Sequence, residues 1–253
     1  MRTRVLWLGI LALLIAPSAV LADGIIGSAG SGFVAGWVPN NNGTPYWNNA
    51  SWDGRNANIG FCMTGTGSCT MVSGAPGALP TWVGNTTTWA VDPNFYFSSS
   101  GGNGSAVLQA EIAGYAGFNI FGWYETDANG SAIGASHLLF GGPASAGAVA
   151  TFAPTAYYGF FLTSPAGTFY TLSSLSPSDA GNQHFAVFAP NSSNSNIDFW
   201  MGAEDLRFPN TDADYNDMVV HVSVAKVPEP GTLVLFGSGL LGLAGILRRR
   251  SLG

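Results

Sequence analysis

Short apolar stretches separated by turn residues recur along most of the chain. The clearest are residues 89–97, 105–115, 119–125, 137–142, 157–164, 168–174, 184–190, 197–205 and 218–224. Gly, Pro, Asn and Ser interrupt them, and helical periodicity is almost absent between the two ends of the chain. Many short strands at such spacing are typical of a β-sandwich. The pattern therefore predicts an all-β domain, an antiparallel β-sandwich with jelly-roll-like sheets.

The alternation is clearest in residues 218–224. The even-numbered positions there are all apolar, so we expect them to face the core, with the odd-numbered positions on the opposite face. Residues 23–105 are rich in Gly, Asn and Trp and show few clear strands. They form either the early strands of the same sandwich or a loop-rich cap over it.

The N-terminus has the pattern of a secretory signal peptide. Arg2 and Arg4 precede an uncharged apolar run over residues 5–16, and small residues precede a cleavage point after Ala22. A packed core helix is the alternative, but it does not need basic flanks at a chain start. We expect residues 1–22 to be a signal helix that is removed on export.

The C-terminus reads as a membrane segment. The rigid Pro228-Glu229-Pro230 is followed by residues 231–247, which carry no charge, and then by Arg248, Arg249 and Arg250. These 17 residues are at the short end of the roughly 17–25 that span a bilayer. The arginines should stay cytoplasmic. We therefore expect a transmembrane helix at 231–247 that holds the protein, at least transiently, in the inner membrane.

Residues 227–253 also resemble the PEP-CTERM sorting signal of Gram-negative bacteria, because Pro228-Glu229-Pro230, the apolar helix and the arginine cluster occur in that order at the chain's end. The resemblance implies recognition by an exosortase-type protease near Pro228–Pro230, followed by release or attachment at the cell surface. It also suggests bacteria that make extracellular polysaccharide. A plain single-pass anchor is the alternative.

The segment between these ends, residues 23–226, is one acidic extracytoplasmic domain. Thirteen acids there face only Arg55, Arg207 and Lys226, a net charge of −10. Nucleic acids are bound through Lys and Arg contacts to phosphate, so this balance argues against a nucleic-acid partner. The sparse charge and many turn residues favour an extracellular β-protein.

Cys62 and Cys69 are the only cysteines. In an oxidising compartment a disulfide between them is the natural interpretation. Closing so short a loop contributes roughly 2–3 kcal/mol. A metal site would need more ligands than this pair offers.

Oxygen-bearing side chains gather near the end of the domain in a chain that is otherwise poor in charge. They are Glu204, Asp205, Asp212, Asp214, Asn216 and Asp217. The D-x-D-x-N spacing supplies three oxygens in one turn, as the start of an EF-hand loop does. It is not an EF-hand, because Asp217 replaces the sixth-position Gly and Ser223 the final Glu.

Hard cations prefer such oxygen ligands, so we expect Ca²⁺ to be held here and to stabilise the entry to the last strand. Asx-turns that cap backbone amides are the main alternative. A catalytic role is the third interpretation.

Residues 199–224 resemble the closing motif of a bacterial extracellular domain family of unknown function, with E-D-L followed by D-x-D-Y-N-D and a hydrophobic strand. The likeness extends over residues 107–224. That domain often occurs in secreted adhesin-like and PEP-CTERM proteins. The resemblance implies a β-sandwich and suggests calcium, but it carries no established activity.

Enzyme signatures are weak. There is no G-x-S-x-G nucleophile motif, and His137, His184 and His221 are scattered without metal-binding spacing. Glu111 and Glu125 are the candidate carboxylate pair for glycoside hydrolysis, and strand acids that face solvent are the commoner interpretation. We expect no enzyme activity.

Carbohydrate binding is the stronger alternative function. Aromatic rings stack on sugar faces, and Trp47 and Trp52 lie in a polar, Asn-rich stretch. The sequence thus predicts an exported, surface-sorted, calcium-stabilised protein with a structural or adhesive role in the cell envelope or extracellular matrix. A lectin-like module for extracellular polysaccharide is the alternative, followed by a glycan-active enzyme.

Overall fold

The computed structural model describes residues 24–27, 31–40, 45–49, 56–85, 94–99, 101–154, 156–190, 198–224 and 237–239. Residues 23–225 form one compact unit, and residues 1–22 and 226–253 form a second. The expected signal peptide, Pro228-Glu229-Pro230 and most of the expected transmembrane segment lie outside the described residues, apart from a helical turn at 237–239. Within the described part, no helix combines the length and apolarity needed to cross a membrane.

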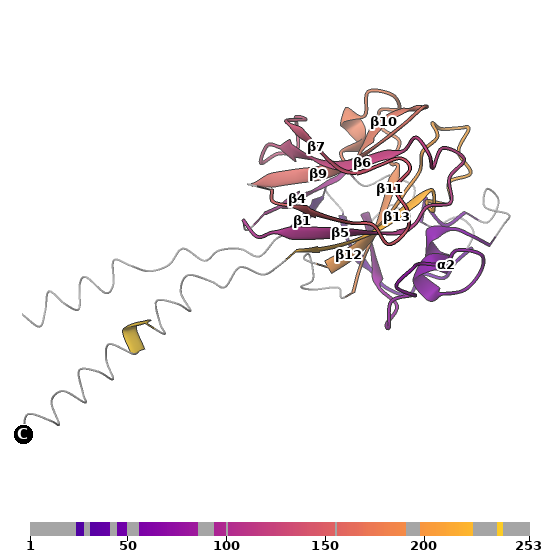
Figure 1. The fold of residues 1–253 in the computed structure, drawn as a ribbon, viewed down its shortest axis with the longest axis horizontal. Coiled ribbons are helices and arrows are strands. Elements are labelled where there is room, and N and C mark those ends of the chain that lie inside the picture. The colour runs from indigo at the N-terminus through magenta and orange to yellow at the C-terminus, as the bar shows by residue number, and fades with distance from the viewer. Residues whose placement is uncertain are drawn as a thin grey trace, which may run out of the picture. The chain divides into compact units, whose positions relative to one another are not determined.

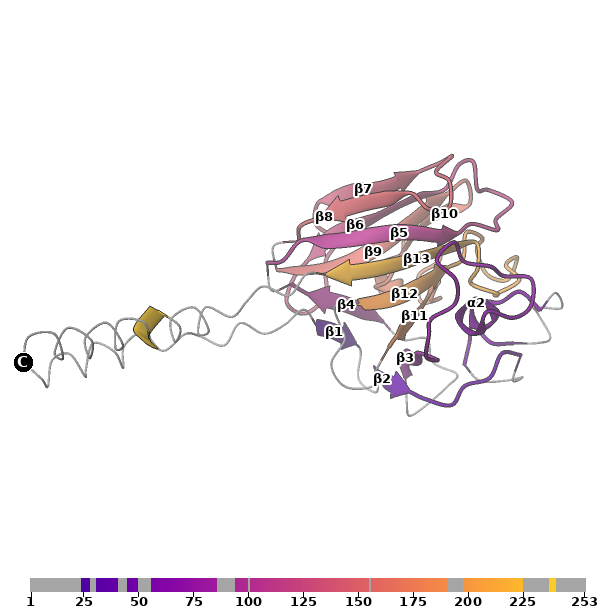
Figure 2. The same ribbon diagram turned by 60° about the horizontal axis from the view of Figure 1, so that its bottom comes forward.

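The described part of residues 24–224 contains two antiparallel sheets (Figure 1). The first sheet has the order β1 (Gly24–Gly27), β4 (Phe95–Ser98), β9 (Tyr157–Ser164), β6 (Ile120–Thr126) and β7 (Ser136–Gly141), with β10 (Gly167–Tyr170) paired to β9. The second sheet has the order β2 (Ser31–Val34), β3 (Thr81–Asn85), β11 (Phe185–Ala189), β12 (Asp198–Ala203), β13 (Met218–Val224), β5 (Gly104–Ala110) and β8 (Val149–Phe152). Figure 2 shows the second sheet in this order. The fold is all-β.

The main core fills the space between the two sheets and is apolar and strongly aromatic. Phe97 of β4 stacks on Phe199 of β12, with ring centroids 4.9 Å apart, so the stack joins one sheet to the other. Phe160 of β9 stacks on Phe121 and contacts Phe97 and Phe199 edge-on. In β13, the even-numbered residues lie in this core, as their alternation predicts.

Residues 35–80, as far as they are described, form a cap on the outer face of the second sheet. The cap contains the short helix α2 (Ile59–Thr64), which is capped by Asn58 at its N-terminus and by Gly65, in a left-handed conformation, at its C-terminus. Its apolar residues pack against Ala186 and Phe188 of β11 and against Val219 of β13. Residues 23–105 therefore supply both early strands and a cap, so each of the two interpretations holds for part of that stretch.

The cap is stabilised by the disulfide that the sequence predicts. Cys62 in α2 and Cys69 in the following loop are bonded, with Cα atoms 4.9 Å apart, and both are buried. A third cluster lies on the outer face of the first sheet, around Tyr124 and Phe161, next to β10 and the short helix η1 (Ser173–Leu175).

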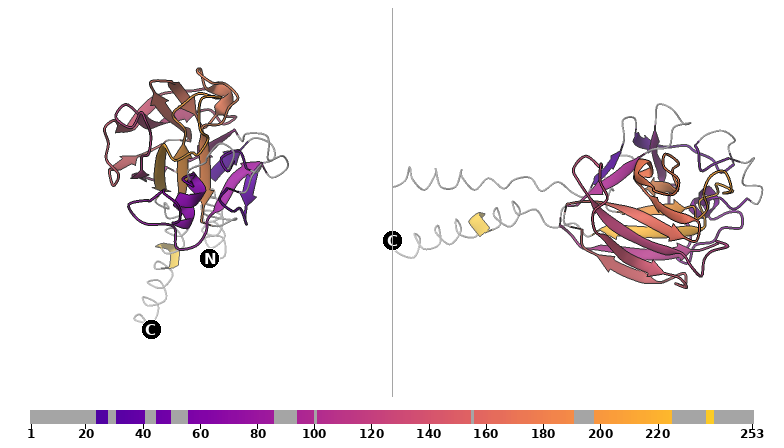
Figure 3. Two further views of the ribbon diagram at one scale, coloured as in Figure 1. Left: turned by 90° about the vertical axis from the view of Figure 1, so that its right-hand side faces the viewer. Right: turned by 90° about the horizontal axis from the view of Figure 1, so that it is seen from above.

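The cap and the segment before β13 meet at one end of the sandwich. The views in Figures 2 and 3 both place α2 beside that segment. Two hydrogen bonds join them: the Ile59 amide donates to the Asp214 carbonyl (2.7 Å), and the Asn216 side chain donates to the Ala57 carbonyl (2.6 Å). The acidic residues lie at this junction.

Candidate functional site: a buried acidic end of the second sheet

Strand order brings the acids together. In the second sheet Ala203, the last residue of β12, pairs with Met218, the first of β13, and Val219 pairs with Ala110, the last residue of β5. The ends of β12 and β5 and the start of β13 therefore lie at the same end of the second sheet. Glu204 and Glu111 each follow directly on one of these strand ends.

The backbone of the D-x-D-x-N segment explains how its acids converge. Ala213 (φ 52°) and Tyr215 (φ 55°) have left-handed conformations. Few residues other than glycine adopt such conformations. They alternate with the polar residues Asp212, Asp214 and Asn216, so the chain curls instead of continuing the strand. Conformations of this kind cost on the order of 1–3 kcal/mol each and persist where the surroundings fix them.

Glu204, Asp212 and Asp214 form the centre of the site. Each offers a carboxylate oxygen, and these oxygens all lie within 4.8 Å of one another. Glu204 and Asp214 are completely buried, and Asp212 is half-buried. Because calcium–oxygen distances are about 2.3–2.6 Å, two oxygens on one ion are at most about 5 Å apart. The separation of these three carboxylates is therefore compatible with a shared cation.

The same carboxylates also accept hydrogen bonds from nearby groups. Glu204 Oε1 accepts from the Tyr215 amide (2.6 Å), and Glu204 Oε2 accepts from the Thr211 hydroxyl. Asp214 accepts from both the backbone amide (3.2 Å) and the side chain (2.7 Å) of Asn216. The Asx-turn alternative therefore describes part of the arrangement. The Asn216 side chain donates both to Asp214 and to the Ala57 carbonyl, so it links Asp214 to the cap.

The electrostatic environment of this site favours neutralisation of the buried carboxylates. Burial raises the pKa of Glu204 well above its ordinary value, and the charges of Asp217, Asp214 and Asp212 raise it further. Arg207 is the only Lys or Arg in the described part of the chain, and its guanidinium donates to the Ala166 carbonyl (2.6 Å). Within that part, no Lys or Arg forms an ion pair with Glu204.

Asp205 and Asp217 belong to a neighbouring polar group and not to the three-carboxylate centre. The Asp205 amide donates to Asp217 Oδ2 (2.9 Å), and Asp205 Oδ2 accepts from the Asn119 side chain (3.0 Å). Asn119 also contacts Glu111. Burial raises the pKa of Asp217 well above its ordinary range, with the Asp205 charge the next cause. The six predicted residues are thus divided between two adjacent groups.

Glu111 is the acidic residue of this neighbouring group that the sequence did not identify as part of the cluster, and Asn119 was not identified either. Burial raises its pKa to about 7, the bond from Asn119 lowers it, and the Asp205 charge raises it. Its Oε1 atom is buried and has no hydrogen-bond partner, and the same holds for Oδ1 of Asn119. Glu111 lies more than ninety residues before the motif, so only the strand order reveals its proximity.

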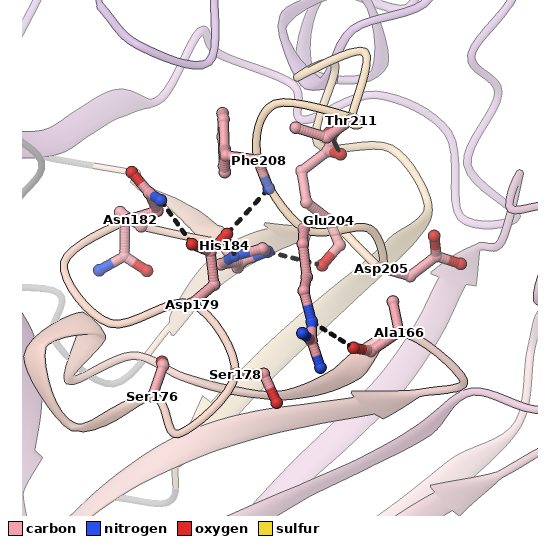
Figure 4. A network of polar contacts seen from close by, with 12 residues as sticks. Ala166, Ser176, Ser178, Asp179, Asn182, His184, Glu204, Asp205, Phe208 and Thr211 are labelled. Atoms are coloured by element: carbon pink, nitrogen blue, oxygen red, sulfur yellow. Dashed lines mark hydrogen bonds and ion pairs between the residues drawn. The ribbon is translucent and has the colours of Figure 1, made fainter.

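A second buried polar network, also absent from the sequence prediction, lies beside the site (Figure 4). His184 contacts the Glu204 carbonyl through Nδ1 (3.2 Å) and Asp179 through Nε2 (3.1 Å), and its ring stacks on Phe169. Burial lowers the pKa of His184, opposed by Asp179. Burial would raise the pKa of Asp179, but bonds from Asn182, the Phe208 amide and His184 outweigh it and lower the pKa. This network fixes the backbone that presents Glu204.

The glycosidase pair considered from the sequence does not assemble. Glu111 contacts Asn119, which immediately precedes β6, whereas Glu125 lies six residues further along that strand. At about 3.3 Å per residue this is about 20 Å along the strand. Glycosidase carboxyl groups are separated by roughly 5–9.5 Å. Glu125 instead lies 3.9 Å from His137.

The tryptophan expected to bind sugar is part of the cap's interior. Trp47 is completely buried, and its ring packs edge-on against Trp37 and Phe188. Its ring therefore presents no surface on which a sugar can stack, and in this respect the expectation is wrong. Trp52 lies outside the described residues.

The comparisons with known proteins concern the C-terminus. A model of the PEP-CTERM protein-sorting motif matches residues 226–250. No curated protein and no solved structure matches the chain. The motif confirms the resemblance of the C-terminal segment. Such motifs are membrane-transiting sorting signals processed by exosortase, so this chain is an exported, surface-sorted protein that carries a PEP-CTERM protein-sorting motif.

Proposed function

We propose that this protein has a non-enzymatic, structural role in the cell envelope or extracellular matrix, and that calcium bound by Glu204, Asp212 and Asp214 stabilises its exported domain. The observation that carries the proposal is the gathering of these three carboxylates at the buried end of the second sheet, with oxygens within 4.8 Å of one another. The three carboxylates suit calcium, because calcium prefers hard oxygen ligands.

A bound cation would compensate the buried negative charge of this site. Buried carboxylates are costly unless they are paired with a positive charge or lose their own. In the described part of the chain, no Lys or Arg is paired with Glu204. A divalent cation would neutralise the charge and also use the oxygens that the loop brings together. Bound to the folded form only, it stabilises that form by linkage.

The structural consequence follows from the contacts of the loop. The D-x-D-x-N segment bonds Ile59 and Ala57 of the cap and leads directly into β13, which lies inside the second sheet. Holding Asp212 and Asp214 against Glu204 therefore ties together the cap and the strand ends. A protein at the cell surface, where calcium is available, gains stability from such a tie.

Thermal unfolding of the full chain in calcium and in a calcium chelator tests this function. We expect a lower midpoint in chelator, since a 100-fold excess of ligand over Kd contributes about 2.7 kcal/mol. In Asp212→Asn the difference should disappear. Its midpoint in chelator should equal or exceed that of the wild type, because one repelling charge is gone.

Asp198→Asn is the matched control, because Asp198 lies on the outer face of the second sheet and bonds His221. It should keep the full calcium response. Equal midpoints of the wild-type protein in calcium and in chelator would remove calcium from the account and leave the sorted sandwich without it.

A further inference from the structure

We propose that Asn129 is a site of spontaneous covalent modification in the folded protein, where its side-chain amide is converted to a carboxylate by reaction with the backbone amide of Gly130. The chain has Asn-Gly pairs at residues 42–43, 103–104 and 129–130, and the structure describes the second and the third. Glycine has no side chain that hinders the approach of its amide to the residue before it. The sequence makes these pairs equivalent, and the fold distinguishes them.

The reaction needs only water as a co-reactant. The Gly130 nitrogen forms a bond to Cγ of Asn129, and the bond from Cγ to Nδ2 breaks, so that ammonia leaves with the amide proton. Water then opens the cyclic imide. Opening at Cγ gives aspartate, whereas opening at the backbone carbonyl gives isoaspartate, in which the chain passes through the side chain and is one methylene longer.

Asn129 is exposed in the connection between β6 and β7. Asp127 holds this turn: its carboxylate accepts from the amides of Asn129 (3.1 Å) and Ser131 (2.8 Å), and its carbonyl accepts from the Gly130 amide (3.1 Å). These bonds are local, and Asp127 is exposed. Segments held by exposed hydrogen bonds open at a low cost in free energy. Opening of this turn releases the Gly130 amide for attack on Cγ.

Asn103 is also exposed, but the glycine that follows it is fixed. Gly104 is the first residue of β5 and pairs with Val224 of β13 on one side and with Phe152 of β8 on the other. A Cβ atom built on Gly104 would lie 2.3 Å from the Phe152 ring, which belongs to the main core. Cyclisation at Asn103 therefore requires Gly104 to leave both neighbouring strands and this ring.

Conversion at Asn129 has a structural consequence, because Gly130 is buried against Tyr96 of β4. Gly130 has a φ of 63°, and a Cβ atom built on it would lie 2.6 Å from the Tyr96 ring. The Tyr96 hydroxyl donates to the Ala128 carbonyl (2.7 Å). Isoaspartate adds a methylene between these two contacts, so both cannot keep their present geometry. The modification would therefore release the turn from the outer face of the first sheet.

Peptide mapping by mass spectrometry after incubation of the full chain in mildly alkaline buffer tests the proposal. In the folded chain, conversion at Asn129 should be about tenfold faster than at Asn103, because a paired strand opens less readily than an exposed turn. In urea with the disulfide reduced, the two rates should become similar. Asn129→Gln should show no conversion in the peptide that covers residues 127–135, because its longer side chain cyclises much more slowly.

Two results would overturn the proposal. Equal rates at Asn129 and Asn103 in the folded chain would mean that the fold does not select the site. An Asn129 that stays intact in the folded chain and converts only in urea would mean that the Asp127 bonds protect it. Neither result depends on calcium, so neither bears on the proposed function.

Hydrogen exchange tests the structural consequence. Chains that carry isoaspartate at position 129 should exchange faster in the peptide covering residues 127–135 than unmodified chains. Asn129→Asp is the matched control, because it adds the same charge without the additional methylene, and it should exchange as the wild type does. Equal exchange in the isoaspartate form and in Asn129→Asp would contradict release of the turn from Tyr96.

Discussion

The space between the two sheets and the acidic end of the second sheet are both buried, but opposite kinds of side chain fill them. Between the sheets, Phe97, Phe160 and Phe199 contact one another without a charged group in the cluster. At the acidic end, Glu204 and Asp214 are equally buried among other carboxylates. The first region is stable through burial of apolar surface alone. The second is costly unless its carboxylates are neutralised, and under our proposal this makes it the part of the fold that responds to calcium.

This difference assigns separate tasks to the two regions. The aromatic core determines that two sheets pack together, whatever the ionic conditions. In our account, the acidic end determines how stable the contacts between the cap and the strand ends are. Calcium outside the cell sets that stability.

The largest expected effect belongs to the core. Phe160→Ala should lower the free energy of unfolding by about 3–5 kcal/mol, because large-to-small changes in a core leave a cavity. Phe160 is a fully buried ring that contacts aromatic residues of both sheets. Denaturant unfolding of the full chain in calcium and in chelator measures the loss, which should be the same in both.

The matched control for this core variant is Phe118→Ala, because Phe118 is 69% exposed. This change should alter the free energy of unfolding by no more than about 0.5 kcal/mol, as is usual for surface substitutions. A Phe160→Ala loss confined to chelator would contradict the separation of the two regions.

A smaller effect is expected in the cap. Replacing both Cys62 and Cys69 by Ala should cost roughly 2–3 kcal/mol through loss of the short disulfide loop. Because the disulfide packs in the cap's apolar cluster and not against the carboxylates, the calcium response should persist. Denaturant unfolding with and without calcium measures both quantities. Loss of the calcium response in this variant would show that the cap, and not the carboxylates, carries it.

The sequence pattern was sufficient to predict the bounds of two long central strands. Residues 157–164 and 218–224 were predicted with the bounds that β9 and β13 have in the structure. It was insufficient for β1, β2 and β8, which have only four residues each and show no clear alternation. Short edge strands of this kind are defined by their neighbours and not by their own side chains.

The candidate site was predictable only in part, for a related reason. The spacing of Asp212, Asp214 and Asn216 indicates a curled acidic loop without any knowledge of the fold. The division of Asp205 and Asp217 into a second group depends on Glu111 and Asn119, which are distant in sequence. The strand order determines which strand ends lie at the same end of the sheet. No local sequence pattern contains that order.

Hydrogen exchange of the full chain, measured by mass spectrometry in calcium and in chelator, tests the central claim most directly. The amides of Ile59 and Tyr215 donate to the acidic loop and to Glu204. We predict faster exchange in chelator for peptides that cover residues 56–64 and 204–217, with unchanged protection in β9 and β6. Unchanged exchange at the acidic end, or equal acceleration in both regions, would contradict the claim that a bound cation holds this end of the sandwich.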